Sequence, residues 1–178
     1  MRLLPLAFAA VGMSCALAPG LAKASLIGCD GFMDKLRAEA RDLQIDFSHA
    51  LIVSRAKSDS EVFDISTKAE VDGTLTCRHD ELARFEAHLA EPASARATTA
   101  FERLSAAALR AALGWDAGKS RGEAQTMASD AKEFLAASRE RGDVYIAGKT
   151  EEHAPGGVSL GLIYTDVDRA FAIVGPQE

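Results

Sequence analysis

Two cysteines, Cys29 and Cys77, limit how this chain can fold more than any other feature, because the third, Cys15, lies in a segment that we expect to be removed. In an exported protein, two cysteines are more often bridged than free. A bridge across 48 positions is worth about 4 kcal/mol of stability in the chain-entropy description. Cys29 precedes the first predicted helix and Cys77 lies on the apolar face of a predicted strand. We therefore predict a structural disulfide that fastens this helix to a sheet; without a C-x-x-C spacing, a redox or metal-binding pair is disfavoured.

Residues 1–24 have the pattern of a secretory signal peptide. The basic start Met1-Arg2 precedes an apolar run from Leu3 to Leu17, and Ala22-Lys23-Ala24 places small residues at the two positions that signal peptidase recognises. We therefore predict Sec-type cleavage between Ala24 and Ser25. The mature chain, residues 25–178, would be periplasmic or secreted, and the short leader is typical of bacteria.

Two alternatives to a cleaved leader are weaker. An uncleaved anchor needs roughly 20 apolar residues to cross a bilayer, and the run from Leu3 to Leu17 is shorter than that. A lipoprotein acylated at Cys15 needs a lipobox, and Gly12-Met13-Ser14 is a poor one. Cleavage before Ser25 remains the prediction, with no membrane-spanning segment in the mature chain.

The mature chain is acidic and has the size of one domain. Its 154 residues keep 26 acidic but only 18 basic side chains, because Arg2 and Lys23 lie in the leader, so its formal charge is −8. This excess of negative charge argues against nucleic acid and against an anionic membrane surface as partners. The chain contains no asparagine, which excludes an N-x-S/T glycosylation site.

The first part of the mature chain changes from helical to strand spacing. Residues 30–43 repeat apolar side chains at helical intervals, with Asp30 near the N-cap. Alternating apolar and polar residues then predict strands at 47–53, 62–67 and 70–78. We expect these three strands to form an antiparallel meander.

The middle of the chain is rich in alanine and has helical spacing throughout. Leu82, Phe85 and Leu89 predict a short helix. A longer helix through residues 101–112 is predicted to end at Gly114. A last helix, with its apolar stripe over residues 124–135, is predicted to end at Gly142.

Strand spacing returns near the C-terminus, where we predict strands at 144–149, 158–165 and 170–174. Strands, then helices, then strands form an α+β pattern, so we predict a single domain with a mostly antiparallel sheet of about five to six strands in two groups. The N-terminal helix and the central Ala-rich helical segment are expected to pack on one face of this sheet.

Residues 157–161 match the G-x-S-x-G pattern of a hydrolase nucleophile elbow, with Ser159 at its centre. That chemistry requires a strand before the serine and a helix after it. Here a glycine-proline turn precedes Ser159, a predicted strand continues after it, and no histidine follows it. His153 lies upstream. We therefore predict that Ser159 is a strand residue and not a nucleophile.

Residues 114–120 resemble a phosphate-binding loop only superficially. The P-loop motif requires four residues between its glycines and a preceding strand, whereas this chain has three residues and a preceding helix. A structural account is complete, because Gly114 ends one helix while Ser120 and Glu123 can form a capping box for the next. No nucleotide site is predicted.

Metal-ligand side chains occur in two places, His79-Asp80-Glu81 with His88, and Glu151-Glu152-His153. In the predicted helix, the nine residues from His79 to His88 rise about 13 Å, too far for both to bind one ion. The second cluster is predicted to lie in a loop, where functional residues are common, although such residues are usually only solvated. The sequence predicts no metal site and no cofactor.

Three further features are given structural roles. His49 lies on the apolar face of a predicted strand, where a partly buried, hydrogen-bonded histidine is commoner than a catalytic one. Trp115 follows the glycine that ends a helix and is predicted to fill a gap between helices, with ligand stacking as the alternative. Tyr145, Tyr164 and Phe171 are predicted to pack across the C-terminal strands.

Two functions stay open from the sequence alone. The first is a non-catalytic exported domain that binds a protein or small-molecule partner in the cell envelope, as a free domain or within an envelope complex. The second is a small exported hydrolase or metal-dependent enzyme whose site forms only in the fold. Its candidate residues, which would have to converge in a concave pocket, are His49, His79, Glu81, His153 and Ser159.

Overall fold

The computed structural model describes residues 27–50, 60–143 and 147–176. The predicted leader, its cleavage point between Ala24 and Ser25, and Tyr145 lie outside the described residues. The same holds for residues 51–53 of the first predicted strand.

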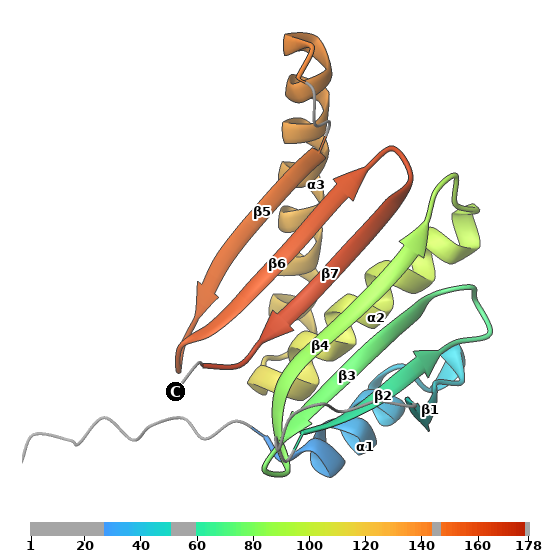
Figure 1. Ribbon diagram of the computed structural model, residues 1–178, viewed down its shortest axis with the longest axis vertical. Helices are drawn as coiled ribbons and strands as arrows, with labels where there is room; N and C mark the ends of the chain where they lie inside the picture. Colours follow the sequence, from blue (N-terminus) through green and yellow to red (C-terminus); the bar gives the residue numbers. More distant parts are fainter. Residues whose placement is uncertain (1–26, 51–59, 144–146, 177–178) are drawn as a thin grey trace, which may run out of the picture.

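The described residues form one antiparallel sheet with three α-helices and one short 3-10 helix (Figure 1). The strands are β1 (Asp46–His49), β2 (Ser60–Ser66), β3 (Asp72–Arg78), β4 (Glu81–Ala90), β5 (Ala147–Ala154), β6 (Val158–Thr165) and β7 (Asp168–Val174). The helices are α1 (Cys29–Glu39), α2 (Ala95–Leu113) and α3 (Ala117–Arg141), with the 3-10 helix η1 (Arg41–Leu43) after α1. The α+β class is confirmed, with seven strands instead of five to six.

Two strand meanders meet in the middle of the sheet. The strand order is β1-β2-β3-β4-β7-β6-β5, and every neighbouring pair is antiparallel. The chain therefore builds β1–β4, continues through α2 and α3, and adds β5–β7 from the far edge inward. Figure 1 shows the helices on one face of the sheet, with the other face uncovered.

The hydrophobic core lies between the helices and the sheet face that they cover. Strand residues alternate between the two faces, so every second side chain enters this layer. Phe85 of β4 lies at its centre, with its ring 5.4 Å from that of Phe32 in α1 and 6.4 Å from that of Phe171 in β7. All three rings are buried. One core therefore joins both meanders.

The predicted disulfide is present. Cys29 at the start of α1 is bonded to Cys77 of β3, and their Cα atoms are 6.0 Å apart. The Cys29 amide also donates to the carbonyl of Asp80 at 2.8 Å, so backbone and side chain both fix this helix end. Asp30 lies in the first turn of α1, two residues after the N-cap Gly28 and so near the cap, as predicted.

The largest error in the predicted elements concerns residues 82–89, which form strand β4 and not a helix. The register between β3 and β4 shifts at Thr76/Cys77, where Leu82 pairs with Cys77 and Arg84 with Thr76. The extra residue, Ala83, forms a bulge that lengthens the spacing between the buried residues Leu82 and Phe85 from two to three. A strand with such a bulge imitates helical spacing over one turn.

The helix ends follow local chemistry, with one correction. Gly114 and Gly142 end α2 and α3 in the left-handed conformation, as predicted. The expected cap at Ser120 is wrong, because Asp116 caps α3 by accepting from the amide of Lys119 at 2.9 Å. Asp is as good a cap as Ser, and Asp116 starts the helix a turn earlier.

The prediction for the residues of strand β5 was also partly wrong. Residues 151–153, expected in a loop, belong to β5 and pair with β6, so that His153 lies opposite Ser159. A run of Glu-Glu-His has low strand propensity, and tertiary pairing overrides it here. The tight turn at Gly156 and Gly157, both with positive φ, returns the chain to β6.

Candidate ligand-binding pocket

The candidate catalytic residues do not converge, with one exception. His49 is exposed at the end of β1, where its ring lies 4.5 Å from that of Phe63, which corrects the partly buried histidine expected there. His79 lies in the β3–β4 turn with positive φ, and Glu81 begins β4. Neither is near the two remaining candidates, Ser159 and His153, which lie on β6 and β5.

Ser159 and His153 contact each other on the uncovered face of the sheet. The Ser159 Oγ atom lies 3.5 Å from the His153 Nδ1 atom, at the long limit of a hydrogen bond. His153 is exposed, and neither side chain lines any of the three cavities described below. A serine–histidine pair needs an enclosed site and oxyanion donors to perform acyl transfer, and these two residues lie on an open strand pair.

His79 and His88 are not joined by a helix, as the sequence analysis assumed, because residues 81–90 form strand β4. The seven steps along the extended chain from Glu81 to His88 span about 23 Å, which separates the two histidines even further than a helix would. Within the described ranges, no group of three or more His, Cys, Asp or Glu side chains is arranged to hold a metal ion.

The candidate site is a cavity of about 300 Å³ at one end of the sheet, where β4 ends and β6 turns into β7 beside α3. We call it the Tyr164 pocket. Its walls are Glu91 and Pro92 after β4, Lys132, Leu135 and Arg139 of α3, and Tyr164, Thr165, Asp166 and Arg169 of the β6–β7 hairpin. It therefore lies where the second meander meets the first.

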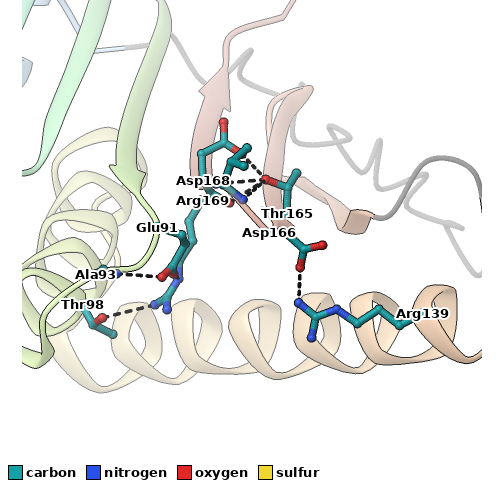
Figure 2. A network of polar contacts seen from close by, with 9 residues as sticks. Glu91, Ala93, Thr98, Arg139, Thr165, Asp166, Asp168 and Arg169 are labelled. Carbon is teal, nitrogen blue, oxygen red and sulfur yellow. Dashed lines mark hydrogen bonds and ion pairs between the residues drawn. The ribbon is translucent and has the colours of Figure 1, made fainter.

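An ion pair between Glu91 and Arg169 forms the inner wall of the Tyr164 pocket. Only 17% and 16% of these side chains is exposed. Figure 2 shows how the pair is held: the second Glu91 oxygen accepts from the Ala93 amide at 2.8 Å, and Arg169 reaches the Thr98 hydroxyl of α2 at 3.5 Å. Such a buried, hydrogen-bonded pair fixes the geometry of a wall better than it adds stability.

The β6–β7 turn forms the rim of the pocket and is internally bonded. The Thr165 hydroxyl accepts from the amides of Val167 and Asp168 at 3.2 and 3.0 Å and donates to the Asp168 side chain. Figure 2 shows Arg139 reaching from α3 to pair with Asp166 of this turn. The rim is thereby tied to α3 before any ligand arrives.

Among the described residues, no hydrogen bond of normal geometry reaches the buried Tyr164 hydroxyl, although the Arg169 side chain lies beside it. Tyr164 is 2% exposed, and the guanidinium of Arg169 lies over its ring, 4.9 Å from the centroid. Burial raises the pKa of Tyr164 above its ordinary value, with Arg169 acting in the opposite sense. The hydroxyl is therefore a neutral donor at pH 7, and leaving it unpaired costs about 1–3 kcal/mol.

Lys132 covers the same ring from α3. Its ammonium lies 5.7 Å from the centroid of Tyr164, a weak cation–π distance, and its side chain is exposed. Within the part of the chain that the structure describes, no carboxylate forms an ion pair with Lys132.

Two other cavities lack these features. A cavity of about 440 Å³ beside the start of α2 is lined by Lys68, Arg96 and Arg103, but Arg103 is already bonded to Asp42 at 2.7 Å. A cavity of about 210 Å³ lies between α2 and α3 around Arg110, whose Nε atom is buried without a hydrogen-bond partner but whose guanidinium pairs with Glu39 of α1. Neither cavity contains a buried hydroxyl without a partner, so we take the Tyr164 pocket as the candidate.

Sequence analysis missed this pocket, although it singled out Tyr164 as a packing residue. Tyr164 is buried as expected but pairs across the strands with Arg169, not with Phe171. One local signal was available. Lys132 and Arg139 flank Leu135 on α3, which places two cations beside the apolar stripe of a helix.

Comparison with known proteins finds no matching family, no matching curated protein and no matching solved structure. Among the described residues, no helix is both long and apolar enough to cross a membrane. Any functional argument therefore rests on the geometry of this chain alone.

Proposed function

We propose that this protein is an exported, non-catalytic binding domain of the bacterial cell envelope whose ligand site is the Tyr164 pocket. Export rests on the leader pattern of residues 1–24 and on the cysteine pair that its removal leaves. Binding rests on one observation, the buried Tyr164 hydroxyl without a partner in a preformed cavity. Preformed cavities with a few directed polar groups are the usual form of a small-molecule site.

Export is tested by expressing the full chain, with its leader, in a bacterial host. We expect recovery from the periplasm, an N-terminus at Ser25 and an intact mass about 2 Da below that of the reduced chain. Two alkylatable thiols, or a cytoplasmic protein that keeps residues 1–24, would contradict the proposed export.

Binding is tested by titrating the ¹⁵N-labelled periplasmic protein with a chemically diverse set of small fragments. We expect the largest amide shifts at Leu135, Tyr164 and Arg169, because these residues line the pocket. Shifts concentrated beside Lys68 and Arg96, at the start of α2, would move the site elsewhere. An absence of saturable shifts for every fragment would contradict a small-molecule function.

A hydrolase is the second candidate, and the contact between Ser159 and His153 is the observation that favours it. A fluorophosphonate probe labels serines that a nearby base activates. We expect no labelling of Ser159, because His153 is exposed and no cavity encloses the pair. Labelling that Ser159→Ala removes would replace the non-catalytic proposal with an enzyme.

A further inference from the structure

We propose that the Tyr164 pocket recognises an oxyanion, a carboxylate or phosphate carried by a small organic ligand, and that Lys132 and Tyr164 are its anchoring donors. This inference rests on the proposed function and specifies the ligand class for the same site. It depends on three properties of the pocket: its charges, its free donors and its apolar wall.

One cation among the lining residues of the pocket forms no ion pair with a lining carboxylate. Its walls carry the cations Lys132, Arg139 and Arg169 and the carboxylates Glu91 and Asp166. Glu91 pairs with Arg169 and Asp166 with Arg139, so these four charges compensate each other in pairs. Lys132 remains, so the lining side chains carry one excess positive charge in a chain whose net charge is negative. A ligand with one negative charge would neutralise it.

The free hydrogen-bonding capacity of the pocket consists of donors. An ammonium has three donors and no acceptor, and the neutral Tyr164 hydroxyl can donate one hydrogen bond. Both Glu91 oxygens are used, one by Arg169 and the other by the Ala93 amide, and the Asp166 carboxylate pairs with Arg139. An oxyanion accepts several hydrogen bonds and donates none. It therefore fits the free groups, whereas an amine or a metal cation does not.

The position of Lys132 over the Tyr164 ring brings these two donors to one point. Lys132 and Arg169 approach the same ring, at 5.7 and 4.9 Å from its centroid. A ligand oxyanion between the Lys132 ammonium and the Tyr164 hydroxyl would replace a weak cation–π contact by two charge-assisted hydrogen bonds. It would also remove the cost of the unpaired hydroxyl.

The rest of the ligand is organic, because part of the pocket wall is apolar. Pro92 and the buried Leu135 line this wall. A free inorganic ion would leave these side chains uncovered, whereas an organic substituent would bury them. Benzoate and phenyl phosphate are therefore suitable probes, and benzamide is the uncharged match of benzoate.

The test compares these probes by calorimetry and by amide shifts in the periplasmic protein. We expect benzoate or phenyl phosphate to bind at least tenfold more tightly than benzamide, with shifts at Tyr164 and Leu135; the stronger of the two identifies the oxyanion. Lys132→Met and Tyr164→Phe should each weaken anion binding about tenfold, the effect of one lost charge-assisted bond. Neither should change the affinity for benzamide.

Lys119→Met is the matched control. Lys119 also lies on α3 over an aromatic ring, 4.0 Å from the centroid of Trp115, but at the opposite end of the helix. This variant should bind the anions as the wild type does. If Lys119→Met and Lys132→Met weaken anion binding equally, the effect is one of net charge alone, and the inference is overturned.

Two outcomes separate this inference from the proposed function. Equal binding of benzamide and benzoate at Tyr164 would overturn the oxyanion inference and leave a binding pocket in place. Anion shifts that map outside the pocket would overturn the inference even if other fragments occupy it. If neither anion nor any fragment binds, both proposals fail.

Discussion

Gly148 is the residue on which the closest approach of strand and helix depends. Gly148 of β5 lies against α3, where an added Cβ would overlap the carbonyl oxygen of Ala131 and lie 2.7 Å from the nitrogen of Leu135. Both obstacles are backbone atoms and cannot rotate away. We expect Gly148→Ala to destabilise the protein by about 3 kcal/mol or more, measured by urea unfolding.

Gly122 provides the control for this prediction. It lies inside α3, and an added Cβ would meet nothing within 4 Å. Gly122→Ala should raise the free energy of unfolding by up to about 1 kcal/mol, because alanine is the better helix former. A Gly148→Ala variant as stable as Gly122→Ala would show that β5 does not lie this close to α3.

The Tyr164 hydroxyl gives a prediction of opposite sign. If it is unpaired in the free protein, Tyr164→Phe removes a buried polar group that lacks a partner and should stabilise the protein by about 1 kcal/mol. The readout is the thermal midpoint without ligand. A lowered midpoint would show that the hydroxyl has a partner in the free protein, which would remove the basis of the proposed site.

At the scale of elements, β5 and α3 contact each other at regular intervals. Two residues of strand span nearly the same length as four residues of helix. Accordingly, Gly148 lies against the backbone of Ala131, and two residues later Thr150 donates to the carbonyl of Met127 at 3.5 Å. Glu152 is the next contact along β5. A hydrogen bond with Glu123, then partial burial, then the negative charges of Glu123 and Asp130 raise the pKa of Glu152 to about 7.

The raised pKa of Glu152, which results from the proton between Glu152 and Glu123, makes the stability of the protein depend on pH. The ordinary pKa of Glu152 is 4.5, so between these two values the folded protein binds the proton more tightly than the unfolded chain does. Its contribution is complete at low pH and is lost as pH rises through about 7. We expect wild-type stability to fall by about 1 kcal/mol between pH 5 and 8 from this pair, because partial exposure screens it.

Urea unfolding of Glu152→Gln across this range tests the pair. The substitution should remove this part of the pH dependence, since an amide does not titrate. Glu133→Gln, on the exposed side of α3, should leave the slope unchanged. An unchanged slope in Glu152→Gln would assign the proton to another group.

The elements also show which parts of the fold could be predicted from sequence patterns. Helices that end at Gly114 and Gly142 were predictable, because left-handed caps depend on one residue and its neighbours. Strand β6 was predictable from alternation. Strand β4 was not, because its bulge at Ala83 changes the spacing of buried residues through a long-range register with β3. The bounds of β5 were mispredicted for the same reason, because they depend on pairing with β6.

At the scale of the whole molecule, the disulfide is the strongest single covalent constraint on the fold. Loss of the Cys29–Cys77 bond in a double Cys→Ser variant should lower the free energy of unfolding by about 4 kcal/mol, measured against the oxidised wild type. Cys15→Ser is the control and should leave the mature protein unchanged. A double variant as stable as the wild type would show that α1 is held by packing alone.

The Tyr164 pocket is formed by segments that lie far apart in the sequence, so no local motif predicts it. Its ion pair joins Glu91 to Arg169, residues 78 positions apart that meet only because β7 pairs with β4. The disulfide, by contrast, was predictable, because cysteine count and compartment suffice without topology. Sites assembled at the junction of two meanders require knowledge of strand order, which local periodicity does not contain.

The central place of β7 has a consequence for biosynthesis. Of the described strands, β7 is made after all the others, and yet it fills the middle of the sheet, between β4 and β6. Until it is made, both meanders have an open hydrogen-bonding edge and cannot complete their shared core. For a chain that is threaded through a translocase, as we propose, this delay keeps the domain unfolded until β7 has been made. A premature stop codon before β7 would therefore act like a deletion from the centre of the protein.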